Sequence, residues 1–327
     1  MQLDGVTAHP DADVAVVAGS DVAAEARESF AAEYDAPVYA DYEAMLDSEE
    51  VDAVTVVTPH TLHYEQTVAC LERGLDVLLE KPMVTETGQA VDLLARARER
   101  DALLQIGYQR HLHPGYRAVR EAALGGEIGD VHMAACYLTQ DWISGTEGTW
   151  RVDPALSGGG QLSDSGSHLL DALLWTTDSR AREVAAVTDD RNHAVDINTA
   201  LSATLDGPDG PITASVGVSG DGTGFEESLV LWGTDGHLQF DHGGLTVFDG
   251  SGEPDHREFD AGSYAEQTTK KVLAFLDAVE GERDNPVPPE AGLRVTALTE
   301  AAYRASESGE TVDVTELVAE ARAEGGQ

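Results

Sequence analysis

The sequence predicts an α/β protein in two parts, a doubly wound parallel sheet followed by an α+β part with a large, mostly antiparallel open sheet. Short apolar segments alternate with helix-length segments through the first hundred residues, and later strand-like segments are separated by glycine turns. The 327 residues, 42% of them hydrophobic, suffice for two domains. We place these domains at 1–107 and 108–327.

The first part follows the order of βαβ units. We expect strands at 13–18, 38–39, 53–57, 77–79 and 103–107, and helices at 23–34, 42–46, 65–73 and 87–100. The segment at 53–57, Ala-Val-Thr-Val-Val, carries β-branched residues on both faces, as a strand buried on both sides does. The pattern therefore predicts a parallel sheet covered by helices on both faces.

The beginning of the sequence departs from this pattern. A dinucleotide-binding half opens with a strand and a G-x-G-x-x-G turn whose backbone donors hold a pyrophosphate. Here residues 3–9 resemble the end of the helix that would follow such a turn, so 13–18 would be the second strand and the first would be missing. Because the first strand is central in the order 3-2-1-4-5-6, we expect a gap in the sheet. Either the true start lies upstream or normal dinucleotide binding is lost. We favour an upstream start, because loss of a central strand should destabilise a domain by more than its whole free energy of unfolding, roughly 5–15 kcal/mol.

The second part is rich in strands. We expect a helix at 116–124, strands at 131–137, 183–188, 199–205, 212–218, 228–232, 237–240 and 245–248, and closing helices at 267–279 and 293–306. Turn sequences such as D-G-P-D-G at 206–210 and D-G at 249–250 are typical of antiparallel hairpins.

The composition is strongly acidic, with 60 Asp and Glu against 20 Lys and Arg and a formal net charge of −40. So large an excess, spread along the chain, needs counter-ions to screen it, and with so few lysines it indicates a halophilic protein. Nucleic acid and membrane surfaces are disfavoured as partners, because binding them requires clustered basic residues.

Localisation and metal content are predicted from what the sequence lacks. There is no apolar run of about 20 residues and no basic leader region, so we expect a cytoplasmic protein. The two cysteines form no CxxC spacing, and the histidine pairs at 60/63 and 111/113 lack a completing carboxylate. We therefore expect no metal.

Lys81 is the most informative basic residue. It is one of three lysines and lies in E-K-P at 80–82, directly after the apolar run at 75–79. A cation at the carboxyl end of a buried strand, on a loop restricted by proline, is placed where a ligand can reach it. A salt-bridged loop lysine is the simpler alternative. Lys270 and Lys271 open a helix-like stretch, and we expect them to be surface charges.

The segment at 158–171, G-G-G-Q-L-S-D-S-G-S-H-L-L-D, is the second informative motif. Three glycines permit close backbone approach, and Asp164 and His168 lie at i and i+4, on one face of the predicted helix. An imidazole oriented by a carboxylate is an acid/base arrangement. A buried Asp-His pair that fixes the start of a helix is the alternative.

Together these motifs resemble the Gfo/Idh/MocA family of NAD(P)-dependent oxidoreductases over nearly the whole chain. The matching motifs are T-P-x-x-x-H at 58–63, E-K-P at 80–82, W-R at 150–151, the segment at 158–171, and G-E-T-V at 309–312. The resemblance implies a Rossmann-type domain and a C-terminal α/β domain whose open sheet often forms an oligomer interface, hence a homodimer or homotetramer.

The resemblance implies that Lys81, Asp164 and His168 form the catalytic set. We expect the cofactor to contact Ser20, Thr58, Pro59, His63, Glu80, Lys81 and Gln109. We expect the substrate to contact Lys81, Arg110, Trp150, Arg151, Asp164 and His168.

The cofactor preference rests on Gly19-Ser20, at the place where an acidic residue would bind the ribose hydroxyls of NAD. A small hydroxyl residue tolerates a 2′-phosphate, which favours NADP over NAD. Arg27 is near enough in sequence to reach that phosphate, whereas Asp21 would oppose it if it turned inward.

The expected reaction is hydride transfer between the nicotinamide cofactor and a hydroxyl or carbonyl carbon of a sugar, polyol or related carbohydrate. His168 would act as the base, oriented by Asp164, with Lys81 bonded to the reacting oxygen; Lys81 is the alternative base. A non-catalytic sugar- or nucleotide-binding homologue, acting as a sensor or partner, is the alternative function.

Overall fold

A computed structural model describes residue 3, residues 14–250 and residues 252–325. Its N-terminal part holds two parallel sheets, one of β1 (Gly19–Ser20) and β2 (Val38–Tyr39), the other of β3 (Ala53–Val56), β4 (Asp76–Leu79) and β5 (Leu104–Ile106). The helices between them are α2 (Ala24–Tyr34), α3 (Tyr42–Ser48), α4 (His63–Glu72) and α5 (Thr87–Arg100).

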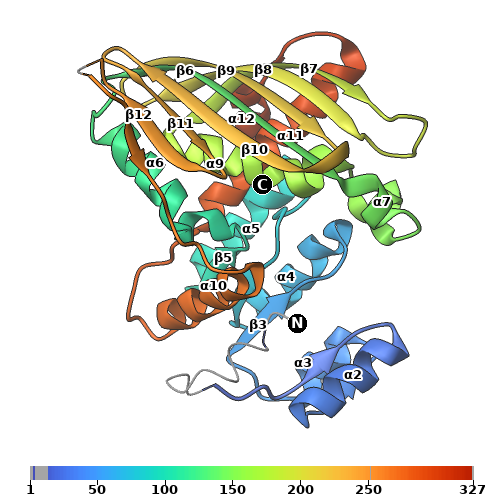
Figure 1. Cartoon of the computed structure of the whole chain (residues 1–327). Helices are drawn as coiled ribbons and strands as arrows, with labels where there is room; N and C mark the ends of the chain where they lie inside the picture. Colours follow the sequence, from blue (N-terminus) through green and yellow to red (C-terminus); the bar gives the residue numbers. More distant parts are fainter. Residues whose placement is uncertain (1–2, 4–13, 251, 326–327) are drawn as a thin grey trace.

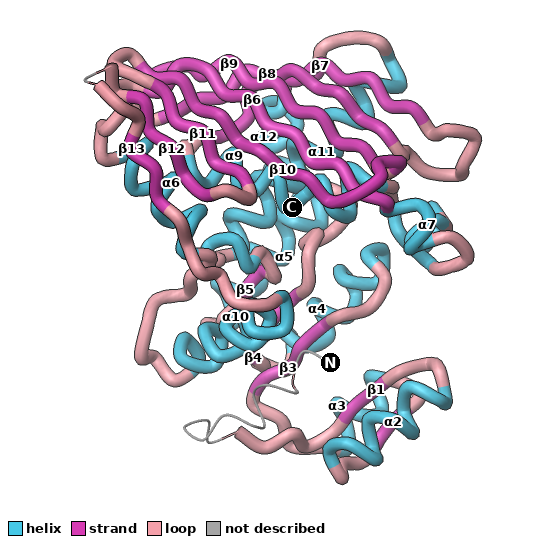
Figure 2. The backbone as a smooth tube through the Cα atoms, viewed as in Figure 1, coloured by secondary structure: helices cyan, strands magenta, loops and turns pink. Residues whose placement is uncertain are grey.

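The gap expected in the parallel sheet is present in the described part of the chain. The strands take the places of 3 and 2, then 4, 5 and 6, so the division falls where a first strand would lie. Figure 2 shows the pair β1 and β2, with α2 and α3, standing apart from β3.

The strand predicted at 13–18 is wrong where it can be compared. Residue 13 lies outside the described residues, 14–18 form no strand, and β1 is confined to Gly19 and Ser20. A strand requires a neighbour to bond, and β2 offers only two residues. Of the helix end expected at 3–9, only residue 3 is described.

The C-terminal part contains a nine-stranded sheet in the order β13-β12-β11-β10-β6-β9-β8-β7-β14. Every neighbouring pair is antiparallel except β6 and β9, which agrees with the predicted open sheet. The strands are β6 (Val131–Asp141), β7 (Arg180–Asp189), β8 (Asn198–Gly207), β9 (Gly210–Ser219), β10 (Asp221–Gly233), β11 (His237–Asp241), β12 (Gly244–Phe248), β13 (Asp255–Arg257) and β14 (Val312–Asp313).

The remaining helices are α6 (Pro114–Leu124), α7 (Trp142–Thr146), α8 (Pro154–Ser157), α9 (Ser167–Thr176), α10 (Tyr264–Val279), α11 (Pro289–Ser308) and α12 (Val314–Gly325). Short helical turns lie at η1 (His60–Leu62), η2 (Gln109–Leu112) and η3 (Trp150–Val152), and η4 (Leu162–Gly166) is a π-helical turn. The short strands β13 and β14, the helices α7, α8 and α12, and the turns η1, η2 and η3 have no strong periodicity and were not predicted, whereas η4 and α9 lie in the helical segment expected after the three glycines.

Helices cover one face of the nine-stranded sheet. In Figure 1, α6, α9, α11 and α12 lie beneath the strands. The alternation along β6 buries Ala134, Cys136 and Leu138 and exposes Met133 and Tyr137. The opposite face of the sheet therefore carries exposed apolar side chains.

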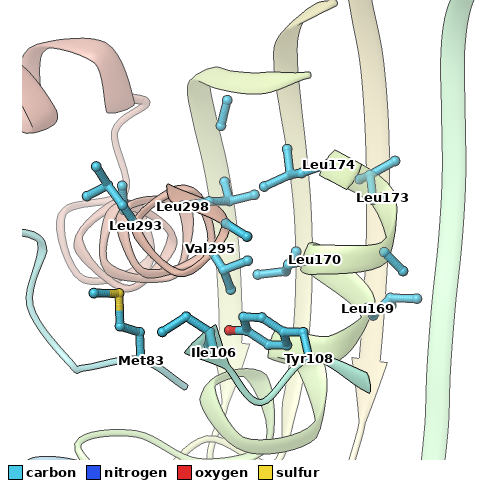
Figure 3. Close-up of a cluster of buried hydrophobic side chains, with 14 of the residues drawn as sticks. Met83, Ile106, Tyr108, Leu169, Leu170, Leu173, Leu174, Leu293, Val295 and Leu298 are labelled. Carbon is cyan, nitrogen blue, oxygen red and sulfur yellow. The ribbon is translucent and has the colours of Figure 1, made fainter. Parts of the chain in front are cut away.

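The two parts of the chain share one hydrophobic core. Figure 3 shows leucines of α9 and α11 packed around Ile106 at the end of β5 and Tyr108 just after it. Farther along the chain, α10 packs on β4, where Val272 and Phe275 contact Leu78. Because the C-terminal helices return to the parallel sheet, the loops at its carboxyl edge are enclosed between the two parts.

Candidate active site

A cavity of about 1140 Å³ lies at the carboxyl edge of the three-stranded parallel sheet. Residues that follow β3, β4 and β5 line it, namely Val57, Thr58, Glu80, Lys81 and Gln109. Its other walls include Arg110, Gln140, Trp150, Arg151, Asp164, His168 and Glu227. In doubly wound folds ligands bind at this edge, so the cavity is the candidate active site.

The Lys81 ammonium is held by Asp164. Its Nζ lies 2.6 Å from Asp164 Oδ1 and donates a second hydrogen bond, of 3.0 Å, to the Asp164 backbone carbonyl. The other carboxylate oxygen accepts a bond of 2.8 Å from the Trp142 indole and lies 3.3 Å from Arg151 Nε. Burial alone would raise the pKa of Asp164, but the charge and hydrogen bond of Lys81 outweigh it and hold that pKa well below its usual value. Asp164 is therefore ionised at neutral pH.

The structure corrects the expected pairing of Asp164 with His168. Both Asp164 oxygens are engaged by other groups, and His168 Nδ1 is buried without a hydrogen-bond partner among the described residues. Asp164 lies in the π-helical turn η4 and His168 in α9, which begins at Ser167, so the two residues do not belong to one regular α-helix. Burial, with the positive charges of Lys81 and Arg110, lowers the pKa of His168 well below its usual value. Its imidazole is therefore neutral at neutral pH.

Two histidines hold the loops around Lys81. His63 is fully buried, with ring nitrogens 2.8 Å from the Pro82 carbonyl and 2.9 Å from the Thr58 carbonyl. It thus joins two loops and does not face the cavity as predicted. His60 lines the cavity, bonds the Ser157 carbonyl at 3.0 Å, and has its pKa lowered to about 3 by burial and by the charge of Lys81.

Asp196 fixes the glycine loop that precedes Asp164, a role that no sequence motif indicated. Its carboxylate accepts bonds from the backbone N–H of Gly160, at 2.7 Å, and of Leu162, at 2.9 Å. The Tyr303 hydroxyl donates a third, of 2.7 Å. A Cβ on Gly160 would lie 2.0 Å from the Asp196 carbonyl oxygen, so only glycine fits there.

Lys271 is not the surface charge that we expected. It is 3% exposed, and its ammonium forms an ion pair with Glu80. The helical stretch T-T-K-K gave no signal of this burial, which depends on where α10 docks. Glu80, expected to contact the cofactor, lines the cavity, and one of its carboxylate oxygens accepts a hydrogen bond from the Lys271 ammonium.

The predicted substrate residues lie together on the cavity wall. Arg110 forms a buried ion pair with Glu227 of β10, which sequence reasoning did not identify. The Arg151 guanidinium lies 4.5 Å from the centre of the Trp150 ring, and His60 packs edge-on to that ring at 4.8 Å. One face of Trp150 is thus already occupied.

The other predicted cofactor residues are spread along the parallel strands. Thr58 and Gln109 line the cavity, and the Thr58 hydroxyl donates to Gln66 at 2.7 Å. Pro59 is the N-cap of η1 and Ser20 ends β1, and both lie outside the described cavity lining.

Searches for a metal centre and for a membrane span gave no candidate. In residues 14–250 and 252–325, no cluster of three His, Cys, Asp or Glu side chains is arranged to hold a metal ion. No helix within the same residues has the length and apolar character needed to cross a membrane.

Comparison with known proteins identifies the family. Residues 3–108 match the family model described as "Oxidoreductase family, NAD-binding Rossmann fold", and residues 116–239 match the GFO/IDH/MocA C-terminal domain. The chain belongs to the GFO/IDH/MocA oxidoreductase family. Membership makes it an NAD(P)-dependent oxidoreductase and favours the enzymatic interpretation over a non-catalytic binder.

Relatives within the GFO/IDH/MocA family match most of the chain. The NADP(+)-dependent scyllo-inositol 2-dehydrogenase of Bacillus subtilis is 26% identical over 305 residues, covering 85% of this chain and 83% of its own. The dTDP-3,4-didehydro-2,6-dideoxy-alpha-D-glucose 3-reductase of Streptomyces violaceoruber is 31% identical over 245 residues, covering 73% and 70%. The structure of the aldose-aldose oxidoreductase of Caulobacter crescentus, complexed with glycerol, matches with a TM-score of 0.78 at 24% identity. The match covers 92% of this chain and 91% of that chain.

The cavity edge fits the nicotinamide end of the GFO/IDH/MocA cofactor. Three parallel strands end at it, and the loops after them place Thr58, Glu80 and Gln109 on its wall. Polar groups at strand ends are what an uncharged amide and a ribose require. These three residues would hold that end of the cofactor, beside Lys81.

Proposed function

We propose that this enzyme transfers a hydride between NADP(H) and a hydroxyl or carbonyl carbon of a sugar, polyol or related carbohydrate. The observation that carries the proposal is the Lys81–Asp164 ion pair, which lines the same cavity as a neutral His168. The named activities of the Bacillus and Streptomyces relatives, on an inositol and on a deoxysugar, support the substrate class.

The residues divide the work of the reaction between them. When bound, the nicotinamide supplies the hydride acceptor or donor. Lys81, placed by its contact with Asp164, donates a hydrogen bond to the reacting oxygen and stabilises the negative charge that develops on it. His168 is uncharged, so it can take the hydroxyl proton during oxidation; in the reverse direction the imidazolium formed in that step returns the proton to the alkoxide. Asp164 acts on Lys81 instead of orienting His168.

The preference for NADP rests on the loop after β1. Ser20 offers no carboxylate to the ribose, and the Arg27 guanidinium donates to the backbone carbonyls of Asp21, at 2.7 Å, and Val22, at 3.0 Å. The Asp21 carboxylate is turned to its own loop, where it accepts from the Ala23 N–H at 2.7 Å. A positive charge beside Ser20, with the nearest acid turned away, favours a 2′-phosphate.

We assign cofactor binding to residues 1–107 and substrate binding and association to 108–327. The exposed face of the large sheet carries Met133, Tyr137 and Val187, which are 42%, 47% and 71% exposed. We propose that a homodimer or homotetramer buries this face. Light scattering in molar KCl gives the mass directly, and a monomer at micromolar concentration would contradict the assignment.

The test of the proposed reaction uses Lys81→Met, with Lys270→Met as the matched control because Lys270 is exposed. Turnover is measured with NADP⁺ and a panel of inositols, aldoses and glycosides in molar KCl, and NADPH binding by fluorescence. We expect Lys81→Met to lose at least about 100-fold in kcat while retaining NADPH affinity, because removal of one stabilising donor has an effect of this order. Unchanged kcat in Lys81→Met would refute the mechanism.

A further inference from the structure

Lys271 is a buried charge that the proposed reaction does not use. It is one of three lysines, it lies on α10, and it is 190 residues beyond Lys81 in the sequence. A buried ammonium is unfavourable unless it is paired and hydrogen-bonded. Its neighbour on the helix, Lys270, is exposed. Of the two adjacent lysines, therefore, only Lys271 is buried.

The partner of Lys271 leads directly to the catalytic loop. Its ammonium pairs with one carboxylate oxygen of Glu80, and the other oxygen, Oε2, accepts a bond of 3.2 Å from the Lys81 backbone N–H. Glu80 therefore ties the backbone of Lys81 to α10. The side-chain ammonium of Lys81 in turn donates a hydrogen bond of 2.6 Å to Asp164 Oδ1.

Gly107 lies directly against Glu80 and limits where its carboxylate can go. A Cβ at residue 107 would lie 2.8 Å from Glu80 Oε2 and 3.1 Å from its Cα, so the carboxylate lies against bare backbone at the end of β5. The backbone carbonyl of Lys271 also accepts a bond of 3.2 Å from Gln105 Nε2, within β5. The side chain of Lys271 thus holds α10 to the loop after β4, and its backbone holds α10 to β5.

We propose that Lys271 is a positioning residue for catalysis: through Glu80, it sets the place of the Lys81 backbone and hence of the Lys81 ammonium in the cavity. This rests on the proposed function, in which Lys81 stabilises the reacting oxygen. Two ion pairs, Lys271 with Glu80 and Lys81 with Asp164, are joined by the hydrogen bond from the Lys81 backbone N–H to the Glu80 carboxylate. Without Lys271, the Glu80 carboxylate loses its ion pair with α10, and the Lys81 backbone N–H that bonds to the same carboxylate loses that anchor.

The experiment compares Lys271→Met, Lys271→Arg and Lys270→Met, each alone and in a Glu80→Gln background, in the full chain. The readouts are kcat and KM for the best substrate of the panel, NADPH affinity, and the thermal midpoint, with kinetics measured well below each midpoint. We expect Lys271→Met to lower kcat at least about tenfold with NADPH affinity kept, Lys271→Arg to restore it within about threefold, and Lys270→Met to match the wild type.

The Glu80→Gln background separates positioning from a general loss of stability. If Lys271 acts through Glu80, Lys271→Met adds less than about a threefold change in kcat to Glu80→Gln. The same tenfold loss in both backgrounds would overturn the inference, as would a folded Lys271→Met enzyme with the kcat of Lys270→Met. Should Lys271→Met alone not fold, the Glu80→Gln pair, in which neither charge remains, gives the deciding comparison.

Failure of this inference is distinguishable from failure of the proposed function. If Lys81→Met keeps full turnover, the proposed mechanism is wrong and the positioning role falls with it. If Lys81→Met is inactive while Lys271→Met is as active as Lys270→Met, only the role of Lys271 is rejected.

Discussion

The Lys81 ammonium lies 2.6 Å from the Asp164 carboxylate, 83 residues further along the chain, and the two come from different parts of the fold. Lys81 follows a strand of the parallel sheet, whereas Asp164 lies in a π-helical turn beside the nine-stranded sheet. This contact joins the carboxyl edge of the three-stranded parallel sheet to η4 in the C-terminal part of the chain.

Loss of the Lys81 charge should destabilise the fold as well as stop catalysis. Lys81→Met leaves the buried Asp164 carboxylate with Trp142 and Arg151 as its near partners among the described residues, and with a neutral His60 at 4.0 Å, so we expect a loss of up to about 3–5 kcal/mol in the free energy of unfolding. Lys81→Met/Asp164→Asn removes the stranded charge and should recover most of that loss without restoring kcat. Urea unfolding at constant KCl measures both, and equal stability of the single and double variants would contradict the expected coupling.

The buried His60 should make the protein sensitive to acid. Its pKa is about 3 in the folded state against 6.5 normally, so below pH 6.5 only the unfolded chain takes up the proton, and stability falls as the pH drops toward 3. The slope approaches about 1.4 kcal/mol per pH unit. Relative to the wild type, His60→Gln should flatten the fall between pH 6.5 and 4.5. Parallel slopes for the two proteins, measured by urea unfolding, would exclude a neutral buried His60.

The cofactor preference should respond to the loop after β1. Ser20→Asp places a carboxylate where a 2′-phosphate would lie, so we expect the ratio of NADPH to NADH affinity to fall at least about tenfold. Arg27→Ala should weaken NADPH and leave NADH unchanged, with Glu28→Gln on the exposed face of α2 as the control. Fluorescence titration with both nucleotides gives the ratio, and an unaltered ratio in Ser20→Asp would disprove the assignment.

Gly107 should tolerate no side chain while the catalytic loop is in place. Gly107→Ala brings a methyl group against Glu80, whose backbone cannot swing away, so kcat should fall by about tenfold or more. Gly88→Ala on α5 is a matched control, because a Cβ there meets nothing within 4 Å and alanine favours a helix. Steady-state kinetics on both variants decide the matter; wild-type kcat in Gly107→Ala would show that the loop adapts.

Much of the fold could be predicted from local patterns. The helix at Thr87–Arg100 and the strand at Val38–Tyr39 have the predicted bounds, because caps, turns and β-branched residues mark them within a few residues. The strand predicted at 13–18 failed because a strand is defined by its neighbour, which no local pattern supplies. The same holds for β13 and β14, which are too short to show a period.

The site was predictable where a motif marks a loop, and not where tertiary packing sets the partner. E-K-P and the glycine segment led to Lys81, Asp164 and His168, which the structure brings to one cavity. The expected bond between Asp164 and His168 was wrong because Lys81 and Trp142, on other elements, take the two Asp164 oxygens, and residue spacing does not show such tertiary contacts. Lys271 and Asp196 have no motif, and their roles depend on distant elements that dock on the loops they hold.

The pairing of Glu80 with Lys271 spans 191 residues, which has a consequence for biosynthesis. At roughly 5–20 residues per second, about 10–40 s separate the synthesis of the loop from that of α10. A ribosome-bound chain that has completed its parallel strands therefore lacks the helix that places the lysine. On the proposed role of Lys271, full turnover therefore begins only after α10 has been made.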